Sequence, residues 1–194
     1  MSVLLDAGPS LNFLAVGQQN VLIQLAGAMD LQLQAPERVD REVLGVARGS
    51  RFKRTAVQKT WKTLTSAGRV VILDDTLEST VFMNAVTRIS GMPAKDRVRD
   101  SKSLGEIMVL AHASVYAQAG EQVFVLIDDG DGRDRALKER AWLKRNEYTG
   151  RVVLWSTRDV LEKAAEFPGW IDKEKTWEVV YDEMRKFDDG LVPR

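Results

Sequence analysis

The apolar run Val123–Ile127, which stops at two adjacent aspartates, constrains the fold of this chain more than any other feature. The run is long enough for one buried strand, and Asp128 and Asp129 follow it directly. The start of the chain repeats this arrangement, because Val3–Leu5 lead into Asp6. Buried parallel strands that end in acids are typical of open α/β sheets, whose ligand sites form at the carboxyl ends of the strands. Carboxylates that meet there repel one another unless a cation lies among them, and Mg²⁺ and Mn²⁺ suit such oxygen ligands.

Short apolar segments alternate with helical patterns along the chain. We predict strands at 2–5, 31–35, 70–73, 123–127 and 152–155. We expect helices near 9–16, 19–26, 36–47, 56–66, 77–89, 103–119 and 131–144. The helix at 103–119 carries apolar residues on nearly every face, which predicts a buried central helix. The alternation predicts the α/β class, with a three-layer α/β/α architecture and a central parallel sheet of four or five strands.

The composition excludes several kinds of chemistry. The chain has 194 residues, 44% hydrophobic and 29% charged, as is typical of a folded globular protein. It contains no cysteine, which excludes disulfides, thiolate metal sites and thiol catalysis. The single histidine, His112, lies among apolar residues of the predicted central helix, and we interpret it as a packed residue. Hydrolytic chemistry in this chain therefore depends on carboxylates and a metal ion.

We expect one main domain with an extension. Residues 1–155 contain the predicted sheet and the acids. Residues 156–190 contain Trp170, Trp177 and Tyr181 and are expected to form one or two helices that pack on this domain or on a partner. Residues 191–194 match the pattern left by cleavage of an expression tag and are not used to predict the fold. No apolar run is long enough for a bilayer and the first residues do not form a secretory signal, so we expect a cytoplasmic protein that binds no membrane.

Two of the candidate acids have a purely structural interpretation as well as a functional one. Asp6 is either a site residue or a turn aspartate that accepts backbone hydrogen bonds at the start of the next helix. Glu42 lies between basic neighbours and, by itself, is best explained by a solvated helix face. Ser10 and Asn12 follow Asp6 within the first predicted helix. We interpret both as surface residues, with orientation of a ligand or water as the alternative.

The other acids lie near the predicted starts of two helices. Ser103 and Glu106 fit a capping box, in which the glutamate bonds back to the first residue of the helix. Gly105, a poor helix former, favours instead the close approach of a ligand or of backbone. Asp128 and Asp129 are adjacent, so their side chains are expected to point apart. At most one of them is then expected to face a pocket, while the other supports it or caps the next helix.

Basic residues gather in two places although the formal net charge is zero. The first cluster has no acid within it, whereas Asp96 and Asp100 dilute the second, to which Lys102 belongs. These clusters are either solvated loops or a basic rim that holds the phosphates of a polyanion. The first cluster comprises Arg48, Arg51, Lys53 and Arg54.

The acids and their neighbours form an ordered set. It consists of Leu4–Pro9, Glu42 about one helix later, Leu104–Glu106 at the start of the central helix, and Leu126–Gly130 at the fourth strand. In order and spacing this set resembles the PIN-domain family, especially the VapC-like toxins of bacterial toxin–antitoxin pairs. The resemblance covers roughly residues 2–155. Two features depart from the common family pattern, since the third acid is a glutamate after glycine and the chain exceeds the minimal toxin at 48–99 and after residue 155.

The resemblance implies a PIN-like fold and a ribonuclease that depends on Mg²⁺ or Mn²⁺. It implies a catalytic quartet of Asp6, Glu42, Glu106 and Asp129, with Asp128 competing for the last place. Asp6 and Asp129 are then expected to hold the metal directly, with Glu106 and Asp128 as further candidate ligands. It also implies an RNA substrate, a homodimer and an antitoxin partner. The residues expected to contact RNA are Arg48, Arg51, Lys53, Arg54, Lys102 and Arg133.

Other functions remain open at this point. A PIN-like domain without catalysis would bind RNA or protein, and a structure-specific DNA nuclease would use the same acids. A phosphatase of the haloacid-dehalogenase type is disfavoured, because Gly8 stands where its second acid is required. A receiver domain is disfavoured because the paired acids come late in the chain.

Overall fold

A computed structural model of the chain describes residues 1–172 and 174–193. In these residues five strands form one all-parallel sheet, with the spatial order β3-β2-β1-β4-β5. The predicted parallel sheet is confirmed, and each predicted strand end lies within one residue of its observed position. The strands are β1 (Ser2–Leu5), β2 (Gln32–Pro36), β3 (Val70–Leu73), β4 (Gln122–Leu126) and β5 (Arg151–Trp155).

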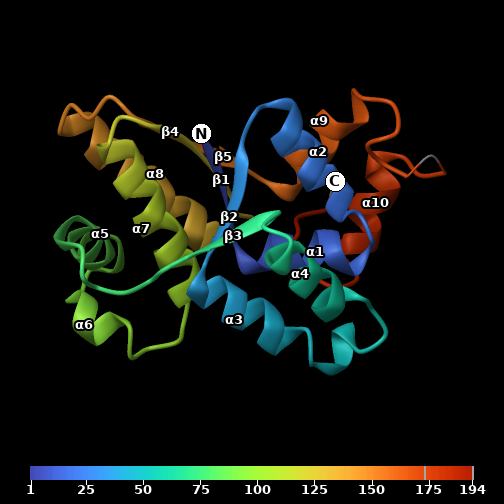
Figure 1. The fold of residues 1–194 in the computed structure, drawn as a ribbon, viewed down its shortest axis with the longest axis horizontal. Helices are drawn as coiled ribbons and strands as arrows, with labels where there is room; N and C mark the ends of the chain where they lie inside the picture. Colours follow the sequence, from blue (N-terminus) through green and yellow to red (C-terminus); the bar gives the residue numbers. More distant parts are fainter. Residues whose placement is uncertain (173, 194) are drawn as a thin grey trace.

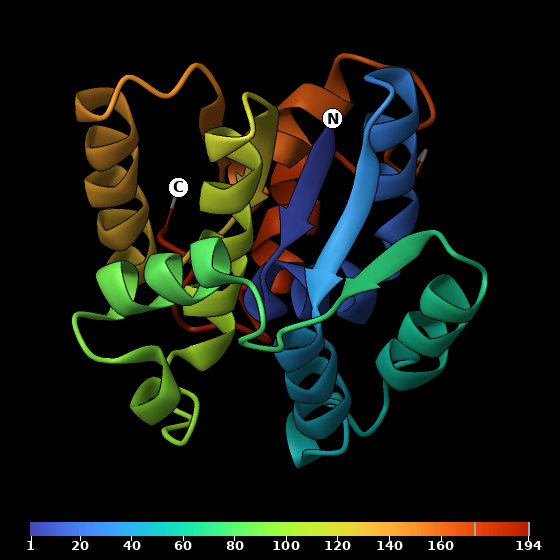
Figure 2. The ribbon, with the colours of Figure 1, turned by 60° about the vertical axis from the view of Figure 1, so that its left-hand side comes forward.

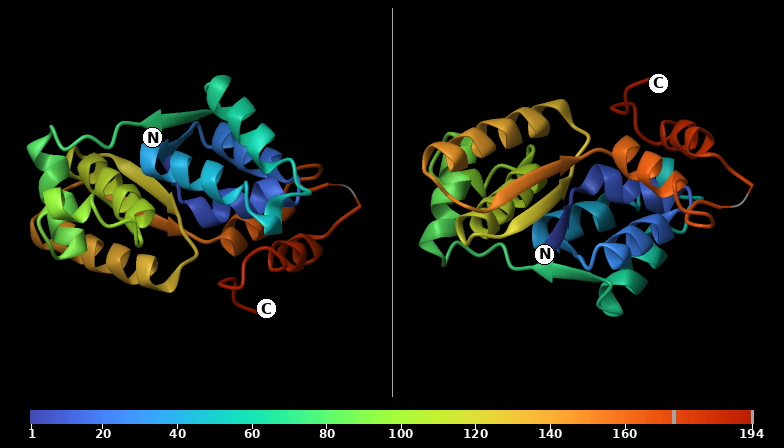
Figure 3. Two further views of the ribbon diagram at one scale, coloured as in Figure 1. Left: turned by 90° about the horizontal axis from the view of Figure 1, so that it is seen from below. Right: turned by 90° about the horizontal axis from the view of Figure 1, so that it is seen from above.

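Helices cover both faces of this sheet (Figure 1). On one side lie α5 (Thr80–Ser90), α6 (Ala94–Arg97), α7 (Leu104–Gln118) and α8 (Gly130–Arg145). On the other lie α1 (Ala7–Ala15), α2 (Gln19–Ala28), α4 (Val57–Ser66), α9 (Thr157–Ala165) and α10 (Trp177–Met184). Figure 3, which shows the molecule from below and from above, has the same two groups of helices on opposite sides of the sheet. The predicted three-layer α/β/α architecture is therefore confirmed.

Strands β1 and β4 are apolar after their first residue because helices bury both of their faces. Leu4, Leu5, Val125 and Leu126 are almost completely buried. Helix α7 packs on the sheet on one side and on α5 and α8 on the others, so nearly all of its faces are buried. The prediction of a buried central helix is confirmed.

Helix α1 begins at Ala7, two residues before the predicted start at Pro9. Proline fits there because the amides of the first helical turn have no intrahelical acceptor. Asp6 is consequently the only residue between β1 and α1, and its backbone N–H donates to the carbonyl of Leu126 on β4 (3.1 Å). The backbone of Asp6 is thereby fixed at the end of the sheet.

The strand order places a topological switch point between β1 and β4. The chain runs outward from β1 through β2 to β3 and then returns to the other side of β1 as β4 and β5. Figure 2 shows β2 leading at its carboxyl end into α3 (Glu37–Val46). In open α/β sheets the ligand crevice forms outside the carboxyl ends of the two strands at such a switch point.

The last part of the chain packs on this domain. Helix α10 contacts α9 and α1, and Tyr181 and Met184 are buried in the main core. Beyond α10, Leu191 is buried in the same core, and the Tyr181 hydroxyl donates to the carbonyl of Val192 (3.0 Å). Residues 185–193, called the C-terminal segment below, are thus held at their far end.

Gly150 offers a direct test of this packing. A Cβ atom there would lie 2.3 Å from the carbonyl oxygen of Ala117 and 2.5 Å from that of Glu121, and backbone atoms of this kind do not yield easily. We expect Gly150→Ala to lower the free energy of unfolding by about 1–3 kcal/mol in urea titrations. Gly27→Ala in α2 is the matched control, since its Cβ meets no atom within 4 Å and should be neutral or stabilising. Equal stability of the two variants would contradict the described packing.

Candidate functional site

Acids from four parts of the chain gather at the switch point. Asp6 follows β1, Glu42 lies on α3, Glu106 lies in the first turn of α7, and Asp128 and Asp129 join β4 to α8. Burial is the main cause that raises the pKa of Asp6 and of Glu106, and repulsion adds to it, from Glu106, Glu42 and Asp128 on Asp6 and from Asp129 and Glu42 on Glu106. The structure therefore brings the five acids into one electrostatic neighbourhood.

Asp6 is the most deeply buried of these acids, with 7% of its surface exposed. It occupies the residue before α1, but its side chain does not cap that helix. Burial is the main cause that raises its pKa to about 8, and the neighbouring carboxylates add to the rise against a hydrogen bond from the amide of Ala7. Without a cation, Asp6 is thus largely protonated at neutral pH.

Glu106 does not form the capping box that its spacing suggested. Ser103 adopts a left-handed backbone conformation (φ 50°) and its side chain caps nothing, so the capping interpretation is wrong. Burial, followed by repulsion from Asp129, raises the pKa of Glu106 to about 7, whereas Arg135 lowers it. Its Oε2 atom is buried and has no hydrogen-bond partner. Such an atom carries a large desolvation penalty unless a ligand or a proton satisfies it.

Two glycines let carboxylates approach closely. A Cβ on Gly105 would lie 2.7 Å from Oε2 of Glu42, whereas one on Gly132 would clash first with the side chain of Ile127 and would lie 3.3 Å from Oε2 of Glu106. Glu42 is an exposed residue, but the end of its side chain rests against α7 in this way. Desolvation there raises the pKa of Glu42, and the positive charge of Arg38 opposes the rise. The group that approaches Gly105 is thus the side chain of a candidate acid, and not the ligand or backbone that we expected there.

Asp128 and Asp129 have different partners, as expected for adjacent side chains that point apart. Asp128 accepts from the backbone N–H and the hydroxyl of Thr157 (2.7 and 2.5 Å), and so ties the end of β4 to α9. Burial raises the pKa of Asp128, and the Thr157 bonds oppose this. Asp129 is exposed and caps α8 through one oxygen, which accepts from Gly132 N (2.9 Å). Among the described residues, its second oxygen accepts no hydrogen bond, so it is free to bind a ligand.

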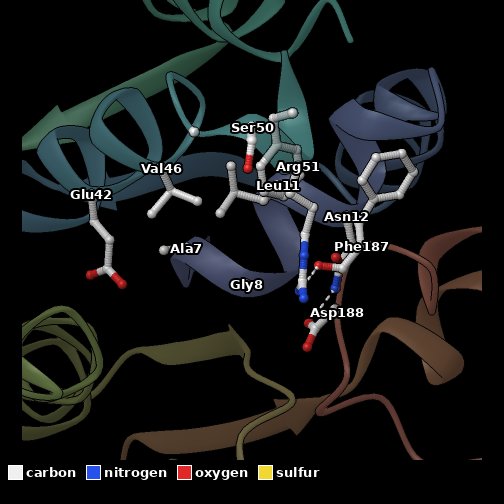
Figure 4. Close-up of a pocket in the computed structure, with 12 residues that line it drawn as sticks. Ala7, Gly8, Leu11, Asn12, Glu42, Val46, Ser50, Arg51, Phe187 and Asp188 are labelled. Carbon is white, nitrogen blue, oxygen red and sulfur yellow. Dashed lines mark hydrogen bonds between the residues drawn. The ribbon is translucent and has the colours of Figure 1, made fainter. Parts of the chain in front are cut away.

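A cleft of about 490 Å³ lies beside these acids (Figure 4). Ala7 and Gly8 form part of its wall, directly after Asp6, and Glu42 lies at one end. The short 3₁₀ turn η1 (Ser50–Phe52) forms another part. The cleft thus leads from the acids to the first basic cluster.

The sequence did not indicate Asp188, which lies in the C-terminal segment and lines the same cleft. The side-chain amide of Asn12 donates to it (2.8 Å), and its charge raises the pKa of Asp128. Asn12 and Ser10 are each only 1% exposed, and the Ser10 hydroxyl donates to the carbonyl of Asp6 (2.7 Å). Their interpretation as surface residues is wrong, because both support groups at the site.

The basic residues expected to contact RNA have different surroundings. Arg133 donates to the carbonyl of Ile127 (3.2 Å) and lowers the pKa of Asp128, so it lies next to the acids. Arg51 donates to the carbonyl of Phe187 and to the carboxylate of Asp189 (2.8 and 2.9 Å). The remaining four are exposed, namely Arg48, Lys53, Arg54 and Lys102.

His112 is packed, as predicted. Its Nε2 is hydrogen-bonded to Asp75 (2.9 Å), whose other oxygen accepts from the backbone N–H of Arg38 (2.7 Å). The imidazole also lies against the ring of Phe82, with 4.4 Å between the centroids. This arrangement links α7 to the start of α3.

The acids suit a hard divalent cation through their chemistry. All their donors are carboxylate oxygens, one of which is buried and unpartnered on Glu106. Within residues 1–172 and 174–193, no three carboxylate or imidazole groups already lie in an arrangement that encloses one ion. Mg²⁺ retains several waters in most protein sites, so one or two direct carboxylates are sufficient for it.

Comparison of the chain with protein-family models, with curated proteins and with solved structures finds no match. Among the described helices, none combines the length and the apolar character needed to span a bilayer.

The raised pKa values predict how stability depends on pH. The folded-state pKa of Asp6, about 8, exceeds its ordinary value of 3.8, so the folded state retains a proton that the unfolded chain has lost between these limits. Stability in EDTA should therefore fall as pH rises through this range, since each pKa unit corresponds to about 1.4 kcal/mol. Asp6→Asn should flatten this fall and stabilise the protein at pH 8, as measured by urea unfolding. Asp96→Asn, an exposed control, should keep the wild-type slope, and the same slope in Asp6→Asn would refute the assignment.

Proposed function

We propose that the protein is a PIN-like endoribonuclease that hydrolyses RNA phosphodiester bonds with Mg²⁺ or Mn²⁺. The observation that carries this proposal is the convergence of five acids at the switch point, with an unpartnered buried oxygen on Glu106. When bound, the cation would neutralise a phosphate and activate a water molecule for attack. The toxin of a toxin–antitoxin pair, acting as a homodimer in the cytoplasm, is the form of this activity that the resemblance favours.

The residues divide the work according to their surroundings. Asp6 and Asp129 would hold the ion, since Asp6 is fixed at the strand end and Asp129 keeps one oxygen without a hydrogen bond. Glu42 and Glu106 would orient water around the ion. Their carboxylates lie close to the backbone at Gly105 and Gly132, respectively. Asp128 supports the site by fastening β4 to α9. The Ser10 hydroxyl holds the Asp6 carbonyl and so stabilises the turn between β1 and α1.

RNA as the substrate fits the charges around the acids. Arg51 of the first basic cluster lines the cleft, and the exposed residues Arg48, Lys53 and Arg54 are its neighbours in the chain. Lys102 precedes the helix that carries Glu106. Phosphates on either side of the cleaved bond would then meet cations, while the acids hold the metal. A module that binds RNA without cleaving it would share these cations but would not need the metal.

Removal of one carboxylate tests the proposed catalysis. We expect Asp6→Asn to reduce Mn²⁺-dependent cleavage of single-stranded RNA by roughly a hundredfold or more, because a direct metal ligand is lost. Asp96→Asn should cleave at the wild-type rate. The measurement is the initial rate on labelled RNA, with EDTA as the blank. An unchanged rate in Asp6→Asn would remove Asp6 from the mechanism. Absence of Mn²⁺-dependent cleavage by the wild type would favour the alternative function, a module that binds RNA without cleaving it.

The exposed cations of the first basic cluster provide a separate test. We expect the double variant Lys53→Ala with Arg54→Ala to bind RNA more weakly in EDTA. The slope of log affinity against log salt should become shallower by about 1.4, as expected for two lost contacts with a single strand. Lys59→Ala with Lys62→Ala is the matched control, since both lysines lie on α4 and outside the cleft. An identical slope in both double variants would mean that the loop is only a solvated surface.

A further inference from the structure

Phe187 and Asp188 of the C-terminal segment form part of the wall of the cleft, at the end away from Glu42 (Figure 4). Phe187 stacks on Phe52 of η1, with ring centroids 5.5 Å apart. Arg51, from the same turn, donates to the carbonyl of Phe187 (2.8 Å) and to the carboxylate of Asp189 (2.9 Å). A cation on the rim of the proposed RNA site is therefore already occupied by an anion of the chain itself.

Asp188, the residue before Asp189, has its carboxylate beside the candidate acids. A Cβ on Gly8 would lie 3.8 Å from Oδ2 of Asp188 and 4.0 Å from Oδ2 of Asp6. The amide of Asn12, a buried residue of α1, holds Asp188 there. A negative charge next to other carboxylates is unfavourable unless a cation is shared between them, so its placement requires an explanation.

Two successive carboxylates thus occupy the kinds of place that two phosphates of an RNA strand would need. Asp189 rests on an arginine, as a flanking phosphate would, and Asp188 lies near the acids, as the phosphate to be cleaved would. We infer that residues 187–189 are an intramolecular competitor that occupies the RNA path and must move aside before RNA binds. This inference rests on the proposed function, because it assigns the cleft to RNA.

Residues 187–190, called the strap below, make contacts that can break while the rest of the domain stays folded. The Arg51–Asp189 pair is exposed, with 50% and 84% of the two side chains accessible, and exposed pairs of this kind contribute little. Before the strap, Met184 of α10 is buried in the core. Residues 187–190 can therefore be displaced while α10 stays in place.

The test compares RNA affinities with EDTA present, so that it needs no catalysis. The variant Asp188→Asn with Asp189→Asn keeps the shape of the strap and removes its two charges. Asp30→Asn with Glu147→Asn is the control for net charge, because both residues are exposed, lie at the amino ends of β2 and β5, and already have positive φ, which asparagine tolerates. The probe is a short fluorescein-labelled single-stranded RNA, and the readout is its anisotropy.

We expect the strap variant to bind RNA about fivefold more tightly than the control variant, which corresponds to release of one exposed ion pair. Arg51→Ala should have little effect in the wild type, where Asp189 occupies the guanidinium, but should cancel the gain in the strap variant. Such non-additivity is the signature of a shared partner.

Equal affinity of the strap and control variants would overturn the inference. Weaker RNA binding by the strap variant, or loss of a Mn²⁺-induced rise in melting temperature, would also overturn it by making Asp188 part of the binding site. Failure of the proposed function is a separate result. In that case neither the wild type nor the strap variant shows Mn²⁺-dependent RNA cleavage, whatever the affinities measured in EDTA.

Discussion

Burial of carboxylates at the carboxyl ends of β1 and β4, to which their mutual repulsion adds, is the constraint on which the rest of this structure depends. The fold keeps Asp6 in place by joining β1 to α1 through this single residue and by bonding its backbone to Leu126. Because the backbone of Asp6 is fixed beside the other acids, protonation or a cation must offset the cost of burying their charges. The same edge then combines an anionic centre with a cationic rim, which is the distribution of charge that metal-assisted cleavage of a polyanion requires.

The sheet was predictable because β1 and β4 are buried on both faces, so each has an almost continuous apolar run in the sequence. The boundaries that were missed depend on turns. Helix α1 begins before Pro9, and the short elements α6 and η1 were not predicted because pieces of three or four residues have no periodicity to detect. The capping box at Ser103 failed because that residue adopts a left-handed conformation, which leaves Glu106 facing the other acids.

The site was predictable to the extent that its residues follow strands. Asp6, Asp128 and Asp129 stand directly after apolar runs, whereas Glu42 was found only through the family resemblance. Asp188 was missed because its position depends on a long-range contact with Asn12, which no local pattern encodes. One signal was present in the sequence, since Asp188–Gly190 repeats the residues of Asp128–Gly130. Its meaning is visible only once α10 returns the chain to the cleft.

Calorimetric titration of the wild-type protein with Mn²⁺ near pH 7, in buffers of different ionisation enthalpy, tests the central claim most directly. If Asp6 and Glu106 share a site that a divalent cation neutralises, binding must be saturable and must release about one proton or more, because both pKa values lie near or above this pH. Absence of saturable binding, or binding without proton release, would contradict the account.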